Sequence, residues 1–307
     1  MPGNPTRVSK VKLLAITTLI CVGSIALTAQ MALAQQKAPS TNSSPVTEQP
    51  EGKAFRTPAA AAAALYAAAR RNDESELLVI LGPGAKKLVS WTDDPNERAE
   101  ERKMFAVKYD QMHRLVKEPD DTVALYVGAE NWPVPIPIVE YEGKWYFDTS
   151  VGRQEILYRQ IGRNEMHALE VCNALIDAEK DYYAGAHKYT AKFISDADSH
   201  DGLYWKASAN EEKSPIGSYL ANAGVSGSSA TREPYYGYYY RIVLEANSSG
   251  NGGEFAVLAF PAEYRSSGVK TFFVPQDGVA YEKDLGPKTD ELAKQISAPD
   301  STWSKVE

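Results

Sequence analysis

The stretch PYYGYYYRIVLEA, residues 234–246, constrains the fold of this chain more than any other part of the sequence. Tyrosine fills five of six consecutive positions, and aromatic and β-branched residues are typical of strands. Side chains alternate between the two faces of a strand, so Tyr236, Tyr238 and Tyr240 share one face. Ile242 and Leu244 continue that face. We therefore predict a strand whose even-numbered tyrosines are buried against a helix.

A helix with one apolar face is available for this packing. It is predicted over 164–184, where Leu169, Cys172 and Ile176 follow one another at helical spacing. A thiol on such a stripe is expected to be a buried, inert apolar group. The odd-numbered Tyr235 and Tyr239 would face the other way, and exposed tyrosines bind sugars and peptides.

The N-terminal residues predict export. Arg7, Lys10 and Lys12 precede an apolar run over 13–27, and small residues at Ala32 and Ala34 fit a signal-peptidase site. We expect cleavage near Ala34, a periplasmic or secreted protein, and no stable membrane span after cleavage. The alternative is a retained N-terminal anchor.

Charge and cysteine content exclude some functions. The chain of 307 residues has a net charge of −7, and residues 1–34 carry three positive charges and no acids, so the mature protein would carry −10. An acidic protein is a poor partner for nucleic acid. Of the two cysteines only Cys172 would remain, which excludes an internal disulfide.

Helix-capping residues, prolines and glycines along the chain predict two α+β domains. These follow a signal peptide (1–34) and a disordered linker (35–52). The first domain, 53–160, has helices starting at Thr57-Pro58 and Asp94-Pro95, the second reaching about Val116. Strands follow over 122–127, 134–141 and 144–148. The second domain, 161–290, has its helix packed on an antiparallel sheet, and 291–307 is predicted to be a loose tail.

One glycine and a run of three prolines lead to two further predictions. Gly162 is predicted to separate a helix starting at Ser150 from the longer one at 164–184. Prolines 133, 135 and 137 recur at period two in WPVPIP, which predicts an edge strand because their missing N–H groups lie on one side. A proline-rich docking ligand is the alternative interpretation.

The first domain, with helices before a sheet that closes on EGKWYFDT, resembles the nuclear-transport-factor-like (NTF2-like) or cystatin-like modules of exported bacterial proteins. This resemblance implies a curved antiparallel sheet around a helix, often with a pocket. Trp91, Tyr109 and Trp132 are candidate binding residues for such a pocket.

The second domain resembles the head of a type IV pilin-like pseudopilin. The resemblance rests on Asn164-Glu165 opening the helix, on GYYYRIVLEAN, and on SGVKTFFVPQDG. A pseudopilin begins with a hydrophobic polymerising helix, whereas the helix at 164–184 is acidic and lies mid-chain. Both halves together, including IGRNE and DGLYW, are similar to a bacterial exported family known only as a domain of unknown function (family number 2950).

The sequence contains few candidates for metal-binding or catalytic residues. Asp196, Asp198 and Asp201 invite a calcium loop, but glycine is missing from the sixth position and a carboxylate from the twelfth of the EF-hand pattern. A polar turn is the alternative. His167 and Glu170 read as a surface pair, no catalytic residue is assigned, and no metal or other cofactor is expected.

We therefore expect a non-catalytic binding or scaffold module of the bacterial cell envelope, whose partner is an envelope protein or a small ligand. The alternative is a periplasmic enzyme or small-ligand receptor with a pocket in the first half.

Overall fold

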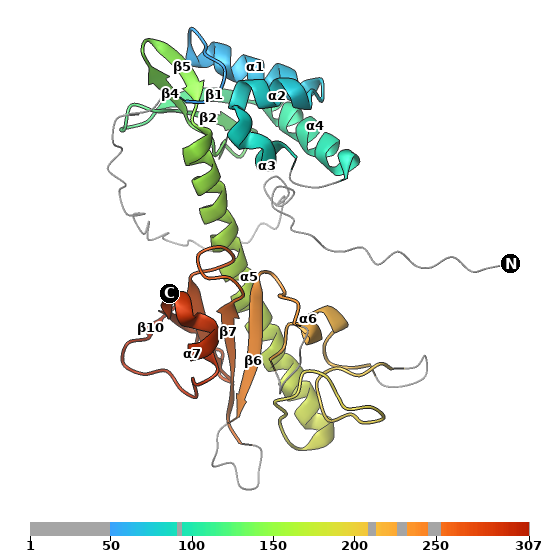
Figure 1. The fold of residues 1–307 in the computed structure, drawn as a ribbon. Helices are drawn as coiled ribbons and strands as arrows, with labels where there is room; N and C mark the ends of the chain where they lie inside the picture. Colours follow the sequence, from blue (N-terminus) through green and yellow to red (C-terminus); the bar gives the residue numbers. More distant parts are fainter. Residues whose placement is uncertain (1–49, 91–93, 208–212, 226–231, 245–252, 307) are drawn as a thin grey trace, which may run out of the picture. The chain divides into compact units, whose positions relative to one another are not determined.

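A computed structural model describes the chain over residues 50–90, 94–207, 213–225, 232–244 and 253–306 (Figure 1). It divides into two compact units, the first ending at Ile156 and the second beginning at Leu157. Each unit combines helices with one antiparallel sheet, which confirms the α+β class. The predicted signal peptide lies outside the described residues. Within the described ranges, no helix has the length and apolar character needed to cross a bilayer.

The first unit begins with helices whose starts are visible in the sequence. Thr57 accepts the N–H of Ala60 at 3.1 Å, and Asp73 and Asp94 cap the later helices in the same way. Such a cap is worth about 1 kcal/mol. The helical elements are α1 (Pro58–Arg70), α2 (Glu74–Leu81), η2 (Pro83–Ala85), α3 (Lys86–Val89) and α4 (Pro95–Gln111).

The sheet of the first unit has the order β1-β2-β4-β5, with the short β3 also paired to β2. Its core includes four fully buried side chains, Ile80, Leu125, Ile138 and Phe147, packed with the alanine-rich face of α1. The strands are β1 (His113–Lys117), β2 (Val123–Val127), β3 (Trp132–Pro133), β4 (Ile138–Tyr141) and β5 (Lys144–Phe147).

One expectation about this unit is wrong and another holds in part. The helix predicted to reach Val116 ends at Gln111, because the next residues form β1 and pair with β2 in register from His113↔Val127. The edge strand predicted for the proline-rich segment is present only as β3, which contains Pro133 and pairs with β2 alone. Pro135 and Pro137 fall between β3 and β4, and β4 itself lies between β2 and β5.

The second unit is a helix on an antiparallel meander of order β10-β9-β8-β7-β6. Its long helix α5 starts in the first unit's part of the chain and continues without a break through Gly162, which is exposed. The predicted break is therefore wrong: a helical glycine costs about 1 kcal/mol, which the packing of Ile161 and Ala168 offsets. The elements are α5 (Thr149–Ala186), α6 (Ser218–Asn222), β6 (Tyr238–Leu244), β7 (Phe255–Pro261), β8 (Lys270–Pro275), β9 (Tyr281–Asp284), η3 (Gly286–Lys288), α7 (Thr289–Ala293) and β10 (Ser304–Lys305).

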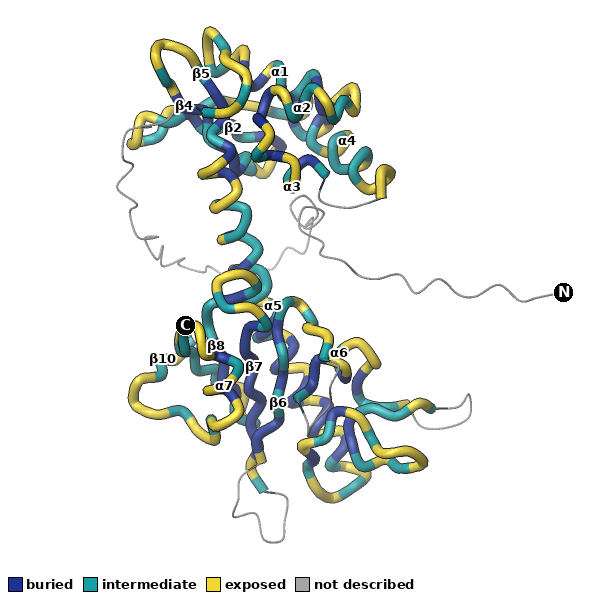
Figure 2. The backbone as a smooth tube through the Cα atoms, in the orientation of Figure 1, coloured by how far each residue is buried: buried dark blue, intermediate teal, exposed yellow. Residues whose placement is uncertain are grey.

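The sheet of the second unit is buried on both faces, as Figure 2 shows for β6 and β7. On one face Cys172 and Ile176 of α5 share a core with Tyr238 and Tyr240, which are all 0–3% exposed. Burial of Cys172, and of these two tyrosines on the same side as the helix, is therefore confirmed. The predicted buried face extends to Ile242 but not to Leu244, which ends the strand and is 41% exposed. Burial also raises the pKa of the Cys172 thiol.

The other face of this sheet is covered by the C-terminal residues, so the predicted loose tail is wrong. Trp303 packs edge-on against Phe273 with ring centroids 6.2 Å apart, and β10 pairs with β9. The Arg241 guanidinium of β6 donates to the carbonyl oxygens of Ala293, at 3.0 Å, and Ile296. Without this segment the apolar side chains on that face would be exposed to water.

Candidate functional site

The turn before β6 holds a tyrosine in an uncommon backbone conformation. Tyr236 and Gly237 have φ of +50° and +75°, and Tyr235 and Tyr238 exchange both backbone hydrogen bonds at 3.0 and 3.1 Å. A two-residue hairpin turn with positive φ at both positions strongly prefers asparagine, aspartate or glycine. A bulky residue there is an outlier. Because the strand begins only at Tyr238, the prediction that Tyr236 is buried is wrong: it is 47% exposed.

Several contacts fix this turn in place. The buried Tyr240 hydroxyl donates to the carbonyl of Tyr235 at 3.2 Å, and the Ala262 N–H donates to the carbonyl of Gly237 at 3.0 Å. Gly237 lies so close to Asn164 of α5 that an added Cβ would be 2.7 Å from Nδ2. That same Nδ2 donates to the Ser267 carbonyl at 2.8 Å. The turn is thus held from the sheet, the helix and a neighbouring loop.

Three rings meet at this turn, and we call Tyr235, Tyr236 and His167 the aromatic surface. The Tyr236 ring stacks on His167 with centroids 4.4 Å apart, and Tyr235 lies 4.5 Å from Tyr236 at a tilt of 59°. His167 Nδ1 is 3.0 Å from Oε2 of Glu170, whose side chain is 72% exposed, which confirms the predicted surface pair. Burial and a hydrogen bond to Tyr236 raise the pKa of the Tyr235 hydroxyl.

The other predicted binding residues that the structure describes each have surroundings of their own. Tyr239 is half-buried between Phe260, 5.9 Å away, and the guanidinium of Arg232, 4.7 Å above its ring. In the first unit, the Tyr109 side chain is buried in a stack with Tyr66 and His113, at 4.4 and 3.9 Å. Trp132 is half-buried against that unit's core, and Trp91 lies outside the described residues.

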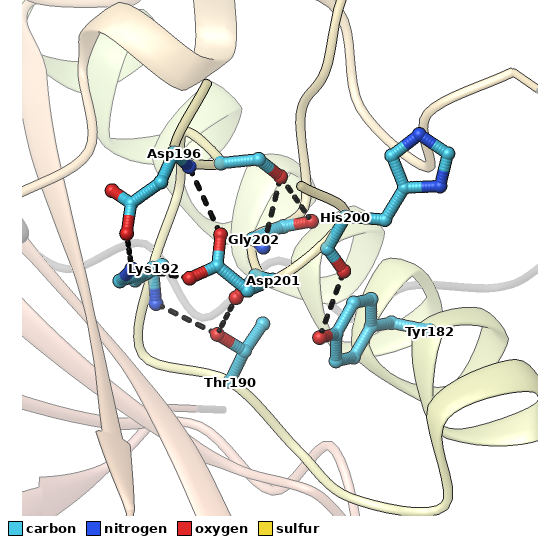
Figure 3. Close-up of polar contacts among 8 residues, drawn as sticks. Tyr182, Thr190, Lys192, Asp196, His200, Asp201 and Gly202 are labelled. Atoms are coloured by element: carbon cyan, nitrogen blue, oxygen red, sulfur yellow. Dashed lines mark hydrogen bonds and ion pairs between the residues drawn. The ribbon is translucent and has the colours of Figure 1, made fainter. Parts of the chain in front are cut away.

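Two of the three calcium candidates contact an ammonium group instead. Lys192 Nζ contacts a carboxylate oxygen of Asp196 at 2.6 Å and one of Asp201 (Figure 3). The lysine and the backbone N–H of Asp196 lower the pKa of Asp201. Asp198 is exposed and has a φ of +59°, as in a turn. Across the described parts of the chain, no three His, Cys, Asp or Glu residues are grouped to hold a metal ion.

A buried carboxyl group ties this acidic loop to α5. Glu179 is 0% exposed, and its Oε2 accepts the N–H of Thr190 at 3.1 Å, while Oε1 is buried with no hydrogen-bond partner in the structure. Burial raises the pKa of Glu179 to about 8, against the smaller opposing effect of the Thr190 N–H. Thr190 Oγ1 in turn donates to the Asp201 carbonyl, and Tyr182 Oη to that of His200 (Figure 3).

The exposure of Tyr236 is not predicted from the sequence, and Glu179 is not singled out there. Each of these two residues nevertheless lies in a sequence pattern that indicates its role. The pair Tyr236-Gly237 has glycine in the second place of a two-residue hairpin turn. Glu179 follows Cys172 and Ile176 by seven and three positions, which places an acid on the apolar stripe of the helix. An ionisable residue on a buried stripe is almost always paired or perturbed.

Comparison with known proteins identifies a family, but the description of that family assigns no activity. The family model described as "Protein of unknown function (DUF2950)" matches residues 52–306. Neither a curated protein nor a solved structure matches the chain.

Proposed function

Because the chain belongs to the DUF2950 family, whose description assigns no activity, we propose its role from its geometry: a non-catalytic binding or scaffold module of the bacterial cell envelope. In this proposal the N-terminal residues direct export and are removed near Ala34. The second unit then presents the aromatic surface to an envelope partner or small ligand.

One observation carries the proposal, namely the exposed Tyr236 in a left-handed conformation. A non-glycine residue held there costs about 1–3 kcal/mol, and the fold would be served better by asparagine or glycine. Packing against His167 and Tyr235 covers only part of the tyrosine, since nearly half of its surface is open to solvent. A large aromatic side chain at a strained and exposed position is typical of a contact residue.

The polar clusters support a non-catalytic role. Lys192, Asp201 and Thr190 bond to one another and to the backbone of their own loop, which is what a structural network does. Glu179 has the raised pKa of an acid–base catalyst, but its side chain has no exposed surface through which to reach a substrate. The likeness of the second unit to a pilin-like head, and of the first to NTF2-like modules, also belongs to this proposal, because such folds bind or assemble.

The test is mass spectrometry of ligands retained by protein purified from cells, combined with a panel of ester, glycoside and peptide substrates. We expect retention of a ligand by the wild-type protein, its loss in Tyr236→Asn, and no turnover. Hydrolysis of any substrate in the panel would contradict the proposal. A retained ligand that survives Tyr236→Asn would move the site elsewhere and favour a receptor acting through the first unit.

A further inference from the structure

We propose that the aromatic surface is a saccharide-binding site, which stacks the ring of a neutral sugar against Tyr236. This inference rests on the proposed binding function and names the ligand class of that site.

The packing of the rings selects a flat ligand. The centroids of His167 and Tyr235 lie 4.4 and 4.5 Å from that of Tyr236, so both rings contact Tyr236 directly. An aromatic cage for an ammonium group needs rings arranged around an open space. Tyr236 is instead packed against its two neighbours and stays 47% exposed, so a ligand can lie against the open part of its side chain. The C–H groups on the face of a sugar ring meet the negative π-face of an aromatic ring favourably.

The surroundings of the aromatic surface select a ligand rich in hydroxyl groups. The Glu170 carboxylate is 72% exposed and is oriented by His167 Nδ1 at 3.0 Å, so it can accept hydrogen bonds from hydroxyls beside the ring. A nucleobase would also stack on Tyr236, but its phosphates would approach an acidic chain of net charge −7. A neutral saccharide has hydroxyl donors for Glu170 and no charge to repel.

The aromatic surface is also ordered before a ligand arrives. The hydrogen bonds to Tyr235 and Gly237 hold the turn, and the stack on His167 holds the Tyr236 ring. Binding therefore does not have to immobilise this side chain, a cost that otherwise reduces affinity. The left-handed backbone at Tyr236 therefore serves to hold the ring in the position needed for binding.

The experiment titrates the purified full chain with chitohexaose and with cellohexaose, two neutral β-linked oligosaccharides, by isothermal titration calorimetry. Tyr236→Asn removes the ring and keeps a residue suited to positive φ. We expect the wild type to bind at least one of the two sugars and Tyr236→Asn to bind at least about tenfold more weakly. The variant's melting temperature should be unchanged or higher. Tyr219→Asn is the matched control, since Tyr219 is another tyrosine of the second unit, 68% exposed on α6, and it should bind like the wild type.

Binding of neither sugar, or equal binding by wild type and Tyr236→Asn, would overturn the inference. If a lysine-rich peptide bound instead and Tyr236→Asn abolished that binding, the saccharide class would be wrong and the binding function would stand. If Tyr236→Asn bound no more weakly than wild type to any of these probes, the saccharide inference would fail, and the ligand-retention comparison of wild type with Tyr236→Asn would decide the binding function separately.

Discussion

Replacing Glu179 with glutamine should change how the stability of the protein depends on pH. Glu179 is fully buried, and burial raises its pKa from 4.5 to about 8 in the folded protein. Between these two values the folded protein holds a proton that the unfolded chain releases. The free energy of unfolding therefore falls as the pH rises through this range, and it levels off above about pH 8.

The magnitude follows from the size of the pKa difference. Each pH unit costs about 1.4 kcal/mol, so the wild type should lose roughly 4 kcal/mol of unfolding free energy between pH 5 and pH 8 through this one group. Glutamine has the same shape, can accept the Thr190 N–H and does not titrate. Glu179→Gln should match the wild type within about 1 kcal/mol at pH 5 and exceed it by several kcal/mol at pH 8.

The assay is urea unfolding at pH 5, 6, 7 and 8, followed by circular dichroism. Tyr182 and Tyr189 lie in the same electrostatic neighbourhood, but burial raises the pKa values of both above 10, so they stay neutral over this range. Asp201, paired with Lys192, stays ionised because its pKa is lowered. Asp177→Asn is the control, since that side chain is 78% exposed on the same helix and should leave the pH profile unchanged. Parallel pH profiles for Glu179→Gln and wild type would refute the reasoning.

Three further outcomes follow from the packing and from the N-terminal sequence. Cys172→Ser should lower the free energy of unfolding by about 1–3 kcal/mol because it buries a hydroxyl, Cys172→Ala should be milder, and a thiol reagent should label the native protein only slowly. Tyr240→Ala should cost about 3–5 kcal/mol in chemical unfolding, whereas the half-buried Tyr239→Ala should cost about 1–2, and equal losses would contradict the assigned faces of β6. N-terminal sequencing of protein from cells should find Gln35 first, and Met1 would exclude cleavage.

The sequence predicts best those elements whose signals are local. Thr57 and Asp94 mark helix starts that the sequence predicts correctly, because a cap depends on the side chain and on backbone groups two or three residues away. The faces of β6 followed from alternation alone, once the strand was known to begin at Tyr238.

The features that could not be predicted depend on residues far away in sequence. The sequence pattern predicts a helix through the residues of β1, because only the pairing of β1 with β2 shows that His113 begins a strand. The C-terminal tail looked polar enough to be loose, yet Trp303 and Ala293 cover the outer face of a sheet built by residues 238–284. Of the candidate site, the sequence predicts an outward-facing Tyr235, and it predicts His167 only as part of a surface pair with Glu170. Their meeting with Tyr236 depends on the packing of α5 against the turn, which no local pattern encodes.

The proposal that this chain is a binding module acting through its aromatic surface is tested most directly in intact cells. A photo-reactive phenylalanine placed at position 236 or, as a control, at the more exposed position 219 would be activated by light, and the products would be separated by mass. We predict a cross-linked species in the envelope fraction from position 236 and not from position 219. No product from position 236, or the same product in equal yield from both positions, would contradict the account.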